Sequence, residues 1–147
     1  MQRLFILILL SFIPTLILAS SPRLETVQIS GIANAISLDI IHASGYRSRK
    51  QLAGIRMLPR FPIYHRALEK RLQVLAMGRP LQMQSLNNQT ALFFYGGENL
   101  SARLLSEGLV VIDPLSLQWL TLHQQQQLIE ALEQARNKGL GIWSEAF

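Results

Sequence analysis

The chain has 147 residues and carries 14 Lys and Arg against nine Asp and Glu, which gives a formal net charge of +5. This length allows one domain with a substantial hydrophobic core and is too short for two. The sequence contains no cysteine, so disulfides, thiolate metal sites and a cysteine nucleophile are excluded.

Residues 1–20 differ in composition from the rest of the chain. Arg3 precedes an apolar run, LFILILLSFIPTLILA at residues 4–19, and the small residues Ser20 and Ser21 follow it. This order is typical of a secretory signal peptide, and Pro14 interrupts a run already shorter than the ~20 residues of a spanning helix. We expect residues 1–20 to be a signal peptide or, if uncleaved, a membrane anchor formed by residues 4–19. The mature chain would then be periplasmic or secreted, with membrane contact only through this segment.

The next part of the chain has the alternating pattern of β-strands. Apolar residues alternate with polar or small ones over residues 26–43, and Gly31 and Asn34 indicate a turn or bulge between two strands. Residues 44–50 are predicted to form a hairpin loop, and residues 51–58 a third strand.

Helical patterns begin after the third strand. Pro62 opens a predicted helix that ends at Gly78, and residues 79–86 and 91–95 form the fourth and fifth predicted strands. A short helix is expected over residues 98–107, and a last helix from an N-cap at Ser116 to Gly139. The order predicts an α+β fold, mainly β, in which residues 24–147 form one five-stranded barrel of the OB-fold type with three helices.

Three stretches of this sequence resemble the staphylococcal nuclease (thermonuclease) family. They are ENLSARLLSEGLVVI at residues 98–112, ALEQARNKGLGIWSE at residues 131–145 and LAGIRMLPR at residues 52–60. The resemblance covers roughly residues 24–145 and implies the same barrel with three helices. It also implies that Trp143 packs behind the last helix and is largely buried.

The resemblance identifies what a nuclease of this family would need. Such an enzyme binds Ca²⁺ through clustered carboxylates, activates water with a carboxylate base and holds the phosphoryl oxygens with two arginines. In this chain Arg56 stands at a metal-ligand position and Arg60 at the position of the base. Residues 32–35 hold no acid, and Gln89 stands where the second arginine belongs. Arg49 or Lys50 lies near the place of the first.

Only one acid, Asp39, lies between residues 26 and 68, and its place in a strand predicts that it faces solvent. One carboxylate does not hold Ca²⁺ tightly. We therefore predict no catalytic residues, no metal ligands and no cofactor, with Ca²⁺ required only if the chain is an active, divergent nuclease.

The remaining feature is basic charge. Nine Lys and Arg lie between Arg47 and Arg79, with Glu69 as the only acid among them. Such a segment favours a nucleic acid or another polyanion as ligand, although a solvated surface has the same composition. The candidate anion-binding residues are Arg47, Arg49, Lys50, Arg56 and Arg60.

Three classes of function remain open from the sequence. The chain is an exported, non-catalytic module that binds a polyanion or a protein partner, a divergent metal-dependent endonuclease, or an accessory subunit of an envelope or membrane assembly.

Overall fold

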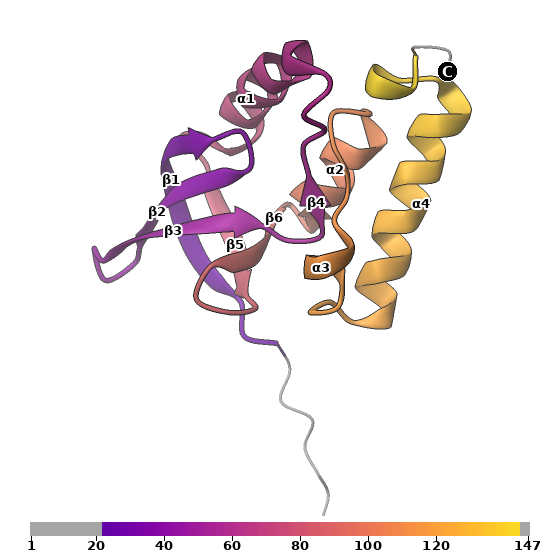
Figure 1. Ribbon diagram of the computed structural model, residues 1–147. Helices are drawn as coiled ribbons and strands as arrows, with labels where there is room; N and C mark the ends of the chain where they lie inside the picture. The colour runs from indigo at the N-terminus through magenta and orange to yellow at the C-terminus, as the bar shows by residue number, and fades with distance from the viewer. Residues whose placement is uncertain (1–21, 145–147) are drawn as a thin grey trace, which may run out of the picture.

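The computed structural model describes residues 22–144, so the predicted signal peptide or anchor lies outside the described residues. Its centre is a closed barrel of five strands (Figure 1). Antiparallel pairs join β1 to β2, β2 to β3, β1 to β5 and β5 to β6, and a parallel pair between β3 and β6 closes the barrel. These strands are β1 (Glu25–Asn34), β2 (Ser37–His42), β3 (Arg47–Leu52), β5 (Pro80–Ser85) and β6 (Thr90–Tyr95).

The alternation in the sequence produces the inner face of this barrel. Val27 and Ile29 of β1, Leu38 and Ile40 of β2 and Leu81 of β5 are all buried, while their strand neighbours are mostly more exposed. The register of β1 against β2 shifts next to Ser30 and again next to Ala33. Such bulges bend a strand, which lets the long β1 pair with both β2 and β5.

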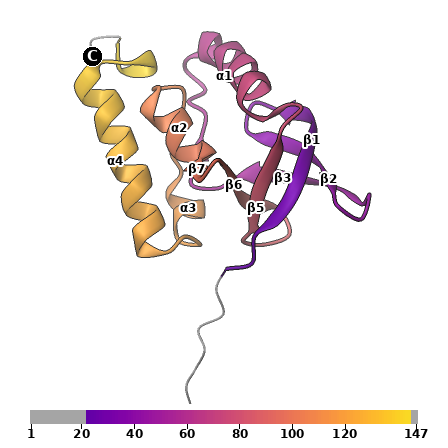
Figure 2. The ribbon, with the colours of Figure 1, turned by 180° about the vertical axis from the view of Figure 1, so that it is seen from behind.

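Helices lie on one side and across one end of the barrel. Figures 1 and 2 show α1 at the upper end, whereas α2, α3 and α4 gather together on one side. The helices are α1 (Pro62–Ala76), α2 (Leu100–Ser106), α3 (Pro114–Leu117) and α4 (Leu122–Lys138), and a 3₁₀ turn, η1 (Gly141–Trp143), follows. Short strands β4 (Ile55–Arg56) and β8 (Val111–Ile112) pair with each other, and β7 (Glu98–Asn99) extends the sheet beside β6.

The structure therefore confirms a closed five-stranded barrel in a mainly β, α+β fold, but it corrects the number of helices from three to four. The predicted start of the last helix at Ser116 is wrong. Thr121 is the N-cap of α4, where the Thr121 hydroxyl accepts from the Gln124 amide at 3.2 Å and the Gln124 side chain accepts from the Thr121 amide at 3.1 Å. Ser116 belongs to the separate helix α3, because Pro114 begins that helix directly after the N-cap Asp113.

One further prediction needs correction, and another agrees with the structure. Residues 47–50 belong to strand β3 and not to the hairpin loop, so their side chains alternate between the two faces of the barrel wall. Trp143 keeps only a minor part of its surface exposed, as predicted, with its indole nitrogen buried and the guanidinium of Arg136 5.3 Å from its ring centre. Its neighbour Ile142 is the fully buried residue of η1. Among residues 22–144, none of the helices has the length and apolar character needed to cross a bilayer.

Candidate anion-binding face

The two arginines of β3 lie on the outer face of the barrel near the β2–β3 hairpin. Arg49 Nε donates to Asp39 Oδ1 at 2.8 Å, and this hydrogen bond, together with the attraction between the charges, raises the pKa of Arg49. Arg47 is exposed and forms no ion pair with any residue from 22 to 144. Both arginines and Asp39 line a shallow depression of about 340 Å³. Asp39 is partly exposed on this face, as predicted, but its charge is balanced by Arg49.

Lys50 points the other way. It follows Arg49 in the strand, so its side chain shares the inner face with Leu52, and only 9% of the residue is exposed. Its ammonium donates to the Asn87 carbonyl oxygen at 2.8 Å and to Ser85 Oγ at 3.3 Å. Lys50 thereby joins β3 to the connection between β5 and β6, and these hydrogen bonds would have to break before the ammonium could bind a polyanion.

Arg56 and Arg60 lie between the barrel and helix α1. Arg56 is in β4, opposite Val111 of β8, and Arg60 is in the turn before Pro62. Both residues are exposed, and neither forms an ion pair within the described part of the chain. Each guanidinium is therefore available to a ligand, with its planar set of donors suited to a phosphate or carboxylate.

The backbone that carries Arg56 is held by contacts with the helical side of the molecule. The Gly54 amide donates to Ser116 Oγ at 2.8 Å, and the Gly54 carbonyl accepts from the Asp113 amide at 2.9 Å. Ser101 Oγ donates to the Ala53 carbonyl at 2.8 Å. A strand end fixed on both sides gives Arg56 a defined position on the surface.

Helix α1 adds more basic charge, but part of it is already paired. Arg66 and Lys70 are exposed without an ion pair among residues 22–144. Arg71 instead binds Glu107, with Nη2 to Oε1 at 2.6 Å and Nε to Oε2 at 2.8 Å. Arg79 lies 5.0 Å from the ring centre of Tyr95. The nine basic side chains of this segment therefore differ in whether their charge is free to bind a ligand.

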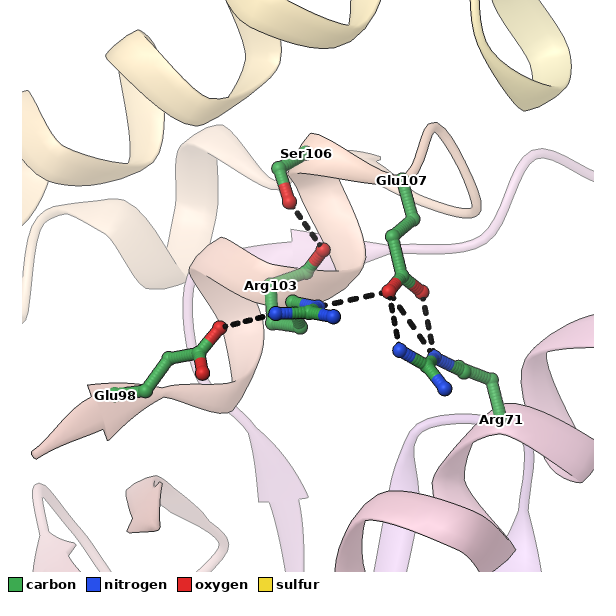
Figure 3. A network of polar contacts seen from close by, with 5 residues as sticks. All are labelled: Arg71, Glu98, Arg103, Ser106 and Glu107. Atoms are coloured by element: carbon green, nitrogen blue, oxygen red, sulfur yellow. Dashed lines mark hydrogen bonds and ion pairs between the residues drawn. The ribbon is translucent and has the colours of Figure 1, made fainter. Parts of the chain in front are cut away.

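Arg71 belongs to a network of ion pairs, shown in Figure 3. This network was not predicted from the sequence. Glu107 also accepts from Arg103 Nε at 2.8 Å, and Arg103 Nη1 donates to Glu98 at 3.1 Å. Burial opposes ionisation of Glu107, but the hydrogen bonds from Arg71 and Arg103 outweigh it and lower the pKa of the carboxyl group. Arg103 in α2 and Glu107, the C-cap of that helix, are four residues apart, and this spacing was the only signal of the network in the sequence.

The predicted site residues therefore separate into three groups. Arg47 and Arg49 lie on the outer face of β3, Lys50 is on its inner face, and Arg56 and Arg60 lie in β4 and in the connection from β4 to α1. Figures 1 and 2 both show the β2–β3 hairpin projecting away from β4 and α1. Arg56, Arg60, Arg66 and Lys70 follow one another along the chain from β4 into α1, and all four are exposed without an ion pair among residues 22–144; we call these four residues the α1 basic group.

Acidic and imidazole groups are dispersed over the described residues. No three His, Cys, Asp or Glu side chains between residues 22 and 144 come together in a way that could hold a metal ion. His42 hydrogen-bonds to Glu25 and Ser48, each at 2.7 Å, and His65 to the Leu58 carbonyl at 3.3 Å.

Comparisons with known proteins do not assign the chain to a family. None of the protein-family models searched matches it, and no curated protein matches its sequence.

Proposed function

We propose that this chain is an exported, non-catalytic module with a nuclease-like OB-fold barrel, which binds a polyanion, such as single-stranded nucleic acid, through the α1 basic group. The observation that carries the proposal is the state of Arg56 and Arg60. Both guanidinium groups are exposed and unpaired among residues 22–144, at the two positions where the resemblance would place a metal ligand and a base.

Replacing carboxylates by arginines changes what such a surface can do. A carboxylate cluster binds a cation, which then binds phosphate and activates water. Fixed guanidinium groups bind the phosphate directly and supply no base. The closed five-stranded barrel is consistent with the OB-fold, and proteins with this fold commonly bind oligonucleotides along one flank.

The electrostatic character of the proposed contact leads to a defined salt dependence. Each phosphate that an arginine neutralises releases a condensed counterion, so the logarithm of the affinity falls linearly with the logarithm of the salt concentration. For single-stranded nucleic acid the slope is about −0.7 for each neutralised phosphate. The double variant Arg56→Ala, Arg60→Ala should therefore bind more weakly, with a salt slope shallower by about 1.4.

The test is a titration with a short single-stranded oligonucleotide and, separately, with heparin, between low and physiological salt. Arg23→Ala, Lys138→Ala is the matched control, because it removes the same charge from two exposed residues outside the basic segment. We expect the control to keep nearly the whole slope. Equal losses in the two double variants, or no binding by the unaltered chain at low salt, would show that the arginines are ordinary surface charge.

A further inference from the structure

Three large apolar side chains are exposed around the turn between α3 and α4. Leu115 is 77% exposed, Trp119 is 56% exposed and Leu122 is 83% exposed. All three lie within one stretch of eight residues that runs from α3 through the turn into the first residue of α4. The backbone of this turn is held in place, because the amides of Trp119 and Leu120 donate to the carbonyls of Ser116 and Leu117. We call these three residues the apolar corner. Exposed apolar patches on a protein surface mark contacts with other proteins or with membranes.

The apolar corner lies at the end of the molecule where the described chain begins. Gln124 of α4 donates from Nε2 to Gln84 Oε1 of β5 at 3.0 Å, and Met83, next to Gln84, pairs with Glu25, the first residue of β1. Figures 1 and 2 agree, because both show the start of β1, helix α3 and the start of α4 at the lower end. Leu24, which precedes β1, is 52% exposed and adds apolar surface there.

The sequence upstream supplies the chemistry of the partner. The apolar run at residues 4–19 ends four residues before Leu24 begins, and the linking residues are Ser20, Ser21, Pro22 and Arg23. Four residues span at most about 14 Å when fully extended. If the run enters a bilayer, this short link holds the lower end of the barrel against the surface of that bilayer. Trp and Leu are suited to this depth, where an apolar body contacts acyl chains and the indole N–H reaches the headgroups.

We infer that the apolar corner, Leu115, Trp119 and Leu122, is a second membrane contact, which inserts at the lipid interface when residues 4–19 are retained as an anchor. The contact fixes the orientation of the domain. Helix α1, with Arg66 and Lys70, lies at the opposite end in both views and points away from the bilayer. The inference stands apart from the polyanion proposal, since it depends on apolar side chains and not on the free arginines.

The absence of cysteine in this sequence makes a direct test practicable. Leu122→Cys and, as the control, Ile63→Cys on α1 each carry a single environment-sensitive fluorophore; Ile63 is 72% exposed and belongs to the opposite end. The full chain is synthesised in a cell-free system with phosphatidylcholine vesicles and without signal peptidase. We expect a blue shift of emission at position 122 that persists at high salt, and no shift at position 63.

Native tryptophan provides a second readout that does not depend on the label. In a Trp143→Phe background, brominated lipids should quench the fluorescence of Trp119. In a Trp119→Phe background, the same lipids should leave the fluorescence of Trp143 unquenched. Equal signals at positions 122 and 63, or equal quenching of the two tryptophans, would overturn the inference. A blue shift at position 122 that appears without vesicles and grows with protein concentration would assign the corner to a second copy of the chain instead.

Discussion

At the scale of single residues, the charge on a side chain is a poor guide to whether that charge is available. Arg49 and Lys50 are neighbours in β3, but Asp39 binds the first and neutral oxygens of Ser85 and Asn87 bind the second. Arg71 binds Glu107 through a two-pronged contact, whereas Arg56 and Arg60 have no partner of opposite charge in the described part of the chain. The available charges are therefore a subset of those counted from the sequence.

Glu107 leads to a prediction about pH. Its folded-state pKa is lowered below the ordinary value of 4.5, so the ionised carboxylate stabilises the fold above that value. This stability is lost as the pH falls through the lower, folded-state pKa. Glu107→Gln should reduce the free energy of unfolding by about 1 to 2 kcal/mol at neutral pH, since it removes charge-assisted hydrogen bonds that are partly exposed.

The measurement is urea unfolding of the unaltered chain and of Glu107→Gln at several pH values from 7 down to 3. The difference in stability between the two should shrink below about pH 4.5, because the protonated carboxyl group resembles the amide. The comparison between two chains cancels the contribution of the other carboxylates. A difference that stays constant over this range would show that the Glu107 charge does not stabilise the fold.

At the scale of elements, the turn between β3 and β4 determines where Arg56 lies. Gly54 has a φ of +79°, and a Cβ built there would lie 2.4 Å from Leu128 Cδ1 of α4. The close approach brings the strand end against α4, with Ser116 accepting from the Gly54 amide. Position 54 therefore favours glycine for its backbone conformation, and a larger residue there would have to displace the buried Leu128 side chain.

Gly54→Ala should lower the free energy of unfolding by about 2 to 4 kcal/mol, from a strained left-handed backbone and an overpacked contact with Leu128. Gly45→Ala is the matched control, because Gly45 has a φ of +82° but nothing within 4 Å of the added carbon. The control should cost only about 1 to 2 kcal/mol. Chemical denaturation measures both, and equal losses would show that the approach of Leu128 to Gly54 relaxes without cost.

At the scale of the whole molecule, the distribution of acids argues against calcium-dependent catalysis. Asp39 is the only acid between residues 26 and 68, and its carboxylate is bound to Arg49. Ca²⁺ takes six to eight oxygen ligands, several of them charged in a tight site. We predict no tight Ca²⁺ binding by calorimetry, and no cleavage of single-stranded DNA or RNA that a chelator abolishes.

The variant Asp39→Asn provides the control for this prediction. Chelator-sensitive cleavage by the purified chain that is lost in Asp39→Asn would contradict it and would favour the divergent endonuclease. Cleavage that is unchanged in Asp39→Asn would point to a contaminating enzyme, because it would not depend on the one acid in this region.

The sequence by itself determined the parts of this protein that depend on neighbours along the chain. Alternating apolar residues predict the barrel strands, Pro62 begins α1 as predicted, and Gly139 ends α4 with a φ of +60°. The basic segment and the missing acids at residues 32–35, 56 and 60 also follow from the sequence alone. These features are local, because backbone preferences and side-chain alternation operate over a few residues.

Tertiary structure decided which of the charged and apolar side chains are available. The partners of Lys50 at Asn87 and of Arg71 at Glu107 lie more than 30 residues away, and no local pattern encodes those pairs. Leu115, Trp119 and Leu122 are exposed around the turn that separates α3 from α4, and the sequence did not predict that turn. Only the closed barrel and the helices packed on it bring such distant residues together, and burial and ion pairing then depend on that proximity.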